Sequence, residues 1–196
     1  MANEADLPAA SLAEAHILFE GYASQRVAST VGFVRDGDAR VIIDPGMTPS
    51  PRVILDPLAA LGVTPESITD VVFSHHHPDH TLNAALFPNA RFHDHWAIYK
   101  DDIWESRPAE GFLLSPSIRL IETPGHSPQD ITTLVGTSTG IFAFTHLWWH
   151  ARGPAEDPRA TDLAALHRGR ERVLQLATII VPGHGSPFTP GPETPR

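Results

Sequence analysis

Three apolar segments of the chain each lead into a turn that ends in a histidine. The turns end at His75, His126 and His184, and the last two read Pro-Gly-His. Short apolar runs of this kind are typical of buried strands, and turns at strand ends can present several side chains from a rigid sheet. We therefore expect a fold in which the ends of strands bring these histidines to one place.

The stretches between these turns predict short strands and a few helices. Asp36-Gly37-Asp38 between two apolar runs is a hairpin signal. The apolar residues of 52–61 and 160–177 recur with helical spacing. Strands are expected at 16–22, 27–34, 39–43, 70–74, 90–93, 117–122, 131–135, 140–144 and 178–181, and further helical segments at 79–86 and 95–100.

The segment 160–177 is the strongest helix prediction, and its two faces differ in character. One face is apolar and is expected to point inward, with Leu163, Leu166, Val173 and Leu174. The other is basic and is expected to point outward, with Arg168, Arg170 and Arg172. No repeat or long linker divides the chain, so a single domain is predicted over 1–196, with loose termini at about 1–12 and 187–196.

Composition limits the chemistry that the chain can perform. It has no cysteine and 12 histidines, so nitrogen and oxygen atoms must supply the ligands of any metal. A formal net charge of −9 disfavours nonspecific nucleic-acid binding. The start, MANEADLPAA, lacks the features of a secretory signal, and no apolar run reaches the roughly 18 residues that span a bilayer. We expect a cytoplasmic protein without a membrane partner; its oligomeric state stays open.

The six residues from His75 to His80 read H-H-H-P-D-H. On a turn after a strand, His75 and His77 can face one ligand pocket, while Asp79 and His80 at the start of a following helix face a neighbouring one. Imidazole and carboxylate are donors that suit Zn²⁺, Fe²⁺ or Mn²⁺, and such a set can leave a position free for water. The alternative is a surface run of histidines, which the recurrence of histidine in two Pro-Gly-His turns disfavours.

The ordered motifs resemble those of the metallo-β-lactamase superfamily. They are His75-x-His77-x-Asp79-His80, Thr123-Pro124-Gly125-His126 and Pro182-Gly183-His184-Gly185, with the earlier turn Ile43-Asp44-Pro45-Gly46. The resemblance covers nearly the whole chain and is greatest to the small single-domain branch that includes glyoxalase II-like hydrolases. It implies an α/β fold of the α+β type, a four-layer αββα sandwich. It assigns His75, His77 and His126 to a first metal site, and Asp79, His80 and His184 to a second.

One position departs from the family pattern. After the strand at 140–144, the family has a Gly-Asp pair whose carboxylate bridges two metals, and this chain has Thr145-His146. A carboxylate can join two cations about 3.5–4 Å apart, whereas a neutral imidazole offers one lone pair. We predict that His146 ligates one metal, the second in preference. In the alternative, His146 is turned away and only one site is filled.

Residues near these motifs have secondary predicted roles. Asp44 resembles the family's aspartate that orients a ligand through its imidazole N–H. His76 is expected to face away from the metals. Trp148 and Trp149 are equally compatible with lining a substrate pocket and with packing beneath a loop. For His93 and His95 a structural position at a strand end is preferred to a second metal site, and Tyr22 and Tyr99 cannot be placed from sequence.

These observations predict a metal-dependent hydrolase acting on a small-molecule substrate. One or two ions, Zn²⁺ first and Fe or Mn as possibilities, would make bound water acidic, and Asp79 is the predicted catalytic proton carrier. An ester, thioester or lactone is the preferred substrate. The runner-up is an endoribonuclease, although no stripe of basic and aromatic residues suggests a nucleic-acid groove. A non-catalytic metal-binding protein and an iron-dependent oxidoreductase are the remaining alternatives.

Overall fold

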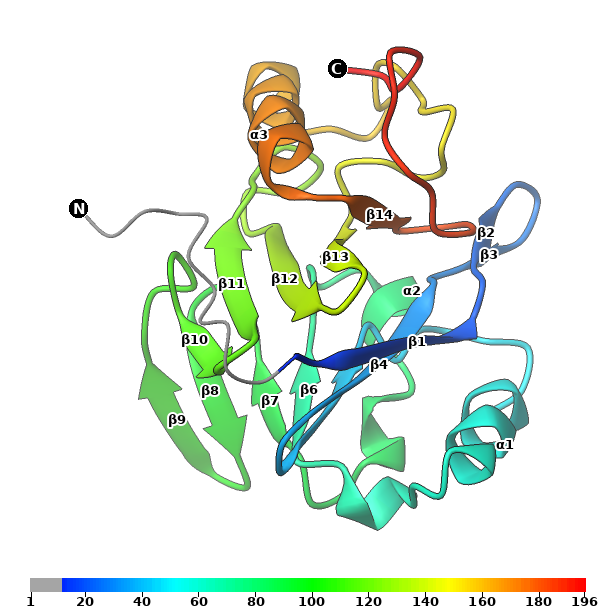
Figure 1. Ribbon diagram of the computed structural model, residues 1–196, viewed down its shortest axis with the longest axis vertical. Helices are drawn as coiled ribbons and strands as arrows, with labels where there is room; N and C mark the ends of the chain where they lie inside the picture. Colours follow the sequence, from blue (N-terminus) through cyan, green and yellow to red (C-terminus); the bar gives the residue numbers. More distant parts are fainter. Residues whose placement is uncertain (1–11) are drawn as a thin grey trace.

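The computed structural model describes residues 12–196, so the predicted loose N-terminal segment lies almost entirely outside the described residues. Within this range two sheets face each other (Figure 1), and a short β2–β3 hairpin stands apart. The first sheet has the order β1-β4-β5-β6-β7-β8-β9 and the second the order β10-β11-β12-β13-β14. No described helix is both long enough and apolar enough to cross a membrane.

The elements have the following bounds. Strands of the first sheet and the hairpin are β1 Glu14–Phe19, β2 Tyr22–Ala23, β3 Val27–Ala28, β4 Val31–Asp36, β5 Ala39–Ile43, β6 Asp70–Val72, β7 Arg91–His93, β8 Ala97–Lys100 and β9 Ile103–Ser106. Strands of the second sheet are β10 Leu113–Ser115, β11 Ile118–Glu122, β12 Ile131–Thr137, β13 Gly140–Thr145 and β14 Ile179–Pro182. Helices are α1 Arg52–Ala60, α2 Pro78–Thr81 and α3 Leu163–Leu176, with 3₁₀ turns η1 Pro65–Ser67 and η2 Ala84–Leu86.

Three buried apolar clusters correspond to the three interfaces of a four-layer αββα sandwich, so the predicted fold is confirmed. Successive residues of a strand point to opposite faces, and β5 illustrates this: Val41 and Ile43 lie in the cluster between the sheets, while Ile42 lies in the cluster beneath α1. On the other side, Leu166 and Val173 of α3 belong to the third cluster with residues of the second sheet. Figure 1 shows α1 and α3 on opposite sides of the two sheets.

Sheet direction brings the predicted ligand turns to one edge. In the first sheet, β5, β6 and β7 are parallel, so the loops after β5 and β6 leave at the same edge. In the second sheet, β13 and β14 are parallel, and β11 runs with them because both β11 and β13 are antiparallel to β12. Loops at the carboxyl ends of parallel strands are the usual place for a site. The turns after β6, β11, β13 and β14 carry the predicted ligands.

Some predicted elements differ from the structure. Residues 97–100, predicted as a helical turn, form β8, because Tyr99 pairs across strands with Phe92 and with Trp104. Such cross-strand neighbours outweigh the local conformational preference of a segment. Strands β9 and β10 were not predicted from sequence, because they too depend on cross-strand pairing. The helix predicted at 79–86 is interrupted, giving α2 and η2.

Helix α3 begins as a capped helix but does not expose all its arginines. The Asp162 side chain accepts a hydrogen bond from the Ala165 N–H, a standard N-cap. Leu163, predicted to face inward, is 39% exposed, while Arg170, predicted to face outward, is fully buried. The Arg170 guanidinium donates to the backbone carbonyls of residues 147, 154 and 155 at 2.6–2.9 Å. It is buried because this loop presents carbonyl groups that need donors.

The C-terminal residues are held against the fold rather than loose. Ile180 and Phe188 exchange backbone hydrogen bonds of 2.8 and 2.9 Å, and the Trp148 indole N–H donates to the Pro195 carbonyl at 2.8 Å. The segment therefore covers part of the apolar layer around α3, where Phe188 also packs.

Candidate metal centre

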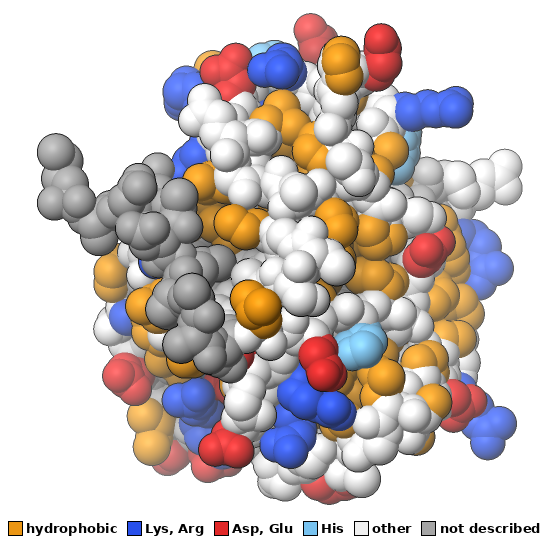
Figure 2. All heavy atoms as spheres, viewed as in Figure 1, with side chains coloured by type: hydrophobic (Ala, Val, Ile, Leu, Met, Phe, Trp, Pro, Cys, Tyr) orange, Lys and Arg blue, Asp and Glu red, His pale blue; other side chains and the backbone are white. Residues whose placement is uncertain are grey.

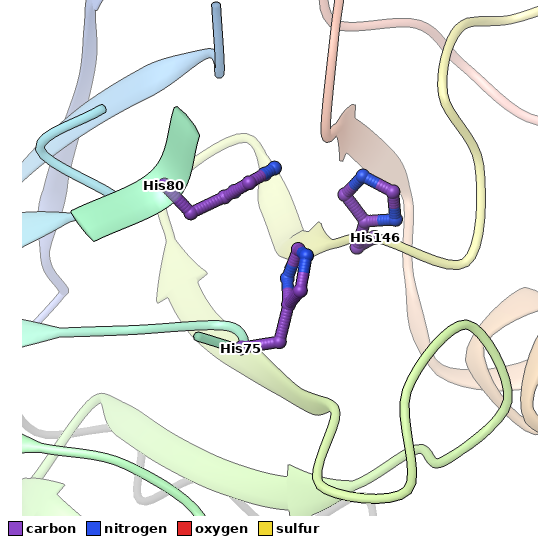
Figure 3. A group of neighbouring side chains, drawn as sticks. All are labelled: His75, His80 and His146. Atoms are coloured by element: carbon purple, nitrogen blue, oxygen red, sulfur yellow. The ribbon is translucent and has the colours of Figure 1, made fainter. Parts of the chain in front are cut away.

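The predicted ligands converge from four separate strand ends. His75 and His77 follow β6, and Asp79 and His80 lie in the short helix α2 that comes next. His126 follows β11, while His146 and His184 follow β13 and β14. Figure 3 shows His75, His80 and His146 pointing toward one another from three segments. All but His77 and Asp79 are buried.

The first predicted set, His75, His77 and His126, has ligand atoms that all lie within 4.8 Å of one another. His77 Nδ1 is 2.9 Å from His75 Nε2 and 3.0 Å from His126 Nε2. Ligands about 2.0–2.1 Å from one zinc ion have nitrogen atoms close to this separation. These three side chains can bind a single cation.

The second predicted set, Asp79, His80 and His184, is equally compact. Asp79 Oδ2 lies 3.5 Å from His80 Nε2 and 3.6 Å from His184 Nε2. The Nε2 atom of His80 is buried without any hydrogen-bond partner among the described residues. An unpartnered buried polar atom costs about 1–3 kcal/mol, so this lone pair fits a cation that the donor set would bind.

His146 lies between the two sets and is not turned away. Its Nε2 is 3.1 Å from His184 Nε2, and its ring centroid is 4.1 Å from that of His126. Its Nδ1 is buried and lacks a hydrogen-bond partner among the described residues. The ring fits because residue 183 is glycine: a Cβ there would come within 2.4 Å of His146 Cδ2. The Pro-Gly-His turn thus makes room for His146 as well as presenting His184.

Acceptors behind the ligands orient the imidazoles of His80 and His184. His80 Nδ1 lies 2.8 Å from Asp44 Oδ2, as predicted from the sequence, and Asp44 is fixed by the Ser74 backbone N–H at 2.7 Å. His184 Nδ1 lies 2.9 Å from the Ala28 carbonyl. A proton on Nδ1 that is donated to such acceptors leaves the Nε2 lone pair free to face the centre.

Asp157 performs the same role for His126, and the sequence analysis did not identify it. Its Oδ2 lies 2.7 Å from His126 Nδ1 and accepts from the Trp149 indole N–H at 3.0 Å. Asp157 belongs to a loop without a recognisable motif and is 31 residues from His126 along the chain. Only the position of this loop beside the β11 turn reveals its role.

Burial favours the neutral, metal-binding form of four histidines of the centre. It lowers the pKa of His75 and of His146 well below the usual range, and neighbouring imidazoles lower both further. Burial and the nearby His80 lower the pKa of His184 to about 4. The more exposed His77 has its pKa lowered by partial burial and by His126, with a smaller effect from the Arg159 charge.

A cavity of about 590 Å³ opens onto the ligands. Asp79 and four of the histidines line it together with Trp149 and Arg159. Residues 23–27 of the β2–β3 hairpin also contribute to its lining. This volume is typical of a site for a small molecule.

Most of the other residues considered from sequence lie outside the cavity. His76 faces away, as predicted: its Nε2 is 2.9 Å from Asp94 and its ring stacks on Trp96. His93 is buried with Nε2 2.8 Å from Asp70. Of the tryptophans, Trp149 lines the cavity, whereas Trp148 is buried in the third apolar cluster.

Comparison with known proteins gives consistent results. The family model "Metallo-beta-lactamase superfamily" matches residues 25–187. The mouse (Mus musculus) protein called metallo-beta-lactamase domain-containing protein 1 is 34% identical over 165 residues, which are 79% of this chain and 62% of the mouse protein. The match thus spans less than two thirds of that relative's length.

Two solved structures share the fold. One, solved in a di-iron-bound form, has a TM-score of 0.65 and 22% identity, and the similarity covers 87% of this chain and 94% of that one. The other is an N-acyl homoserine lactone hydrolase with a product at its catalytic metal centre. Its TM-score is also 0.65, at 16% identity, with 88% of this chain and 92% of that one covered. Taken with the family model and the converging ligand turns, these similarities lead to the conclusion that the chain belongs to the metallo-β-lactamase superfamily.

Proposed function

We propose that the protein is a metal-dependent hydrolase of a small ester, thioester or lactone. The observation that carries this proposal is the pair of donor sets facing one cavity. His75, His77 and His126 would hold the first ion, and Asp79, His80 and His184 the second. His146 would add a ligand, to the second ion in preference, because its Nε2 lies 3.1 Å from His184 Nε2.

The donor set limits the metal to borderline ions such as Zn²⁺, Fe²⁺ or Mn²⁺. When bound, an ion of this kind lowers the pKa of water toward neutrality and polarises a carbonyl oxygen. One structural neighbour contains two irons and another is a dizinc lactonase, so a pair of ions is the stoichiometry we propose.

The chain's own groups would bind the substrate and move a proton. The Asp79 side chain is 16% exposed and lines the cavity, so its carboxylate can accept a proton from attacking water and pass it to the leaving group. The indole of Trp149, held by Asp157, offers an apolar wall to an acyl chain. In the expected reaction, water adds to the acyl carbon, and the single bond from that carbon to the ester oxygen or thioester sulfur breaks. The products are an acid and an alcohol or thiol.

A small substrate is favoured over a nucleic acid. The cavity volume suits a small molecule, and the chain is acidic overall. On the face shown in Figure 2, the Lys and Arg side chains of the described residues form separate groups mixed with acidic ones. A nucleic-acid surface is expected to present a continuous basic stripe.

The test measures metal content and hydrolysis together. Metal-free protein is loaded with Zn²⁺, Fe²⁺ or Mn²⁺, analysed for bound metal, and assayed on a thioester, an ester, a lactone and a single-stranded RNA. We expect acyl hydrolysis that needs metal and that His77→Ala abolishes. His76→Ala is the matched control, because that neighbouring imidazole faces Asp94 instead of the cavity. Metal-loaded protein that cleaves RNA, or that turns over none of the acyl substrates, would contradict the proposal.

The role of His146 is tested by stoichiometry. We expect two ions per chain in the native protein and a lower content in His146→Ala. One ion per chain, unchanged by that substitution, would rule out the ligand role.

A further inference from the structure

Two arginines from separate elements of the fold line the metal cavity. Arg26 lies in the β2–β3 hairpin and Arg159 in the loop between β13 and α3, and both line the same cavity as the predicted ligands. They are 133 positions apart in the chain (159 − 26). Two elements of the fold therefore each bring a positive charge to this one opening.

Neither guanidinium has an acidic partner in the part of the chain that the structure describes. Among residues 12–196, no carboxylate lies within ion-pair distance of Arg26 or Arg159, and neither side chain donates a hydrogen bond to a described group. Some other arginines of the chain are paired, for example Arg91 with Asp70 at 2.8 Å and Arg172 with Glu110 at 2.6 Å. In a chain of net charge −9, Arg26 and Arg159 place two positive charges without an acidic partner among the described residues at the same cavity.

A backbone hydrogen bond and a ring contact hold the two arginines without using the N–H donors of either guanidinium. The Arg159 N–H donates to Asp157 Oδ1 at 2.8 Å, so the same carboxylate that orients His126 also fixes the start of the Arg159 side chain. The Arg26 guanidinium lies over the Tyr22 ring, 5.9 Å from its centroid. Contacts of this kind reduce the entropy that each arginine loses when it binds a ligand.

We propose that Arg26 and Arg159 bind an anionic group of the substrate, a carboxylate or a phosphate, at a distance from the bond that is hydrolysed. This inference rests on the proposed function and specifies its substrate: an acyl compound with a separate oxyanion. Guanidinium groups pair with both oxyanions in a bidentate way. A hydrogen bond to a charged group contributes about 1.5–3 kcal/mol, and about 1.4 kcal/mol is tenfold in affinity. For exposed arginines the lower limit of this energy range is appropriate. We therefore expect each arginine to increase the affinity for the anionic group about tenfold.

Matched thioesters test the charge preference. S-acetyl-3-mercaptopropionate and S-acetyl-N-acetylcysteamine form a carboxylate and neutral pair, and S-acetylpantetheine 4′-phosphate and S-acetylpantetheine form a phosphate and neutral pair. Water's oxygen bonds to the acyl carbon, the carbon–sulfur bond breaks, and the sulfur leaves as a thiol. A thiol reagent detects the product without background, because the chain has no cysteine. We expect kcat/KM to favour one anionic thioester over its neutral partner about tenfold or more.

Variants show whether the two arginines cause this preference. Arg159→Gln and Arg26→Gln are each expected to reduce the anionic-to-neutral ratio about tenfold, and Arg159→Lys to retain part of it. Arg152→Gln is the matched control, since Arg152 is an exposed arginine of the same loop that does not line the cavity. A wild-type ratio near one, or an unchanged ratio in both Gln variants, would overturn the inference while leaving the proposed hydrolase intact.

A binding measurement separates the inference from catalysis. N-acetyl-β-alanine is the amide analogue of the carboxylate thioester, and N-ethylacetamide is a neutral counterpart. Both are titrated into metal-free protein, with the Trp149 indole N–H resonance as the reporter, because that group faces Asp157 beside the cavity. We expect tighter binding of the carboxylate, weakened about tenfold in Arg159→Gln. Equal binding of the two amides, together with no kinetic preference for the phosphorylated thioester, would refute the inference even if hydrolysis were observed. RNA cleavage without acyl hydrolysis would refute the proposed function.

Discussion

The carboxylate of Asp157 lies behind His126, one of the ligands predicted for the first metal site. Its Oδ2 lies 2.7 Å from His126 Nδ1 and also accepts from Trp149, while Oδ1 accepts the Arg159 N–H at 2.8 Å. Replacement by asparagine keeps the size of the side chain but removes the charge and one of the two acceptor oxygens. The His126 N–H then loses the acceptor that fixes its tautomer and orientation.

The size of the effect follows from that contact. Loss of an outer carboxylate partner of a ligating histidine weakens metal binding by about 10–100-fold, or about 1.4–2.7 kcal/mol. We expect the loss of metal affinity in Asp157→Asn to lie near the upper end of this range, because Asp157 is 3% exposed and water cannot easily replace the lost acceptor. Neighbouring Glu156 is exposed, so Glu156→Gln is the control and should bind metal as the native protein does.

The assay is competition for Zn²⁺ with a chromophoric chelator, with circular dichroism to verify the fold. The expected result is a weaker site in Asp157→Asn, with the thermal midpoint of the metal-free protein similar to that of Glu156→Gln. A folded Asp157→Asn protein whose zinc affinity lies within about twofold of the native value would refute the reasoning, because His126 would then be oriented by other contacts.

Three further predictions follow from the buried contacts around the centre. Arg170→Met should lower the free energy of unfolding by about 3–5 kcal/mol, because three carbonyls lose a buried charged donor. Denaturant unfolding measures this change. Arg168 is exposed, so Arg168→Met is the control and should change the free energy of unfolding little. Gly183→Ala should displace His146 and reduce bound metal, because the new Cβ would lie 2.4 Å from its ring; an unchanged metal content would contradict this. Burial lowers the pKa of His184 to about 4 from 6.5, so the unfolded chain binds more protons between these values. The contribution of His184 to the stability of the metal-free protein should therefore be fully present above pH 6.5 and should decrease as the pH falls toward 4. A thermal midpoint that stays constant over this pH interval would argue against a buried neutral imidazole.

Much of the candidate centre could be predicted because its signals are local. Each ligand turn directly follows an apolar strand, and a strand that is buried between two layers needs an apolar sequence wherever it lies in the fold. The short spacing from His75 to His80 is likewise a property of one loop. His146 was a candidate because it stands after a predicted strand where the family pattern has its bridging aspartate, although its position between the two donor sets required the structure.

By itself the sequence determined the apolar strands, the histidine turns that follow them and the exclusion of thiolate ligands. Tertiary structure alone decided which groups stand behind the ligands and what faces the substrate. Asp157 and Arg170 act through partners distant in the chain, and Arg26 and Arg159 reach one cavity from two separate loops. A charged residue on a helix or loop has the same local pattern whether it meets water, a carbonyl or an imidazole. Its role depends on the long-range packing that brings the partner to it.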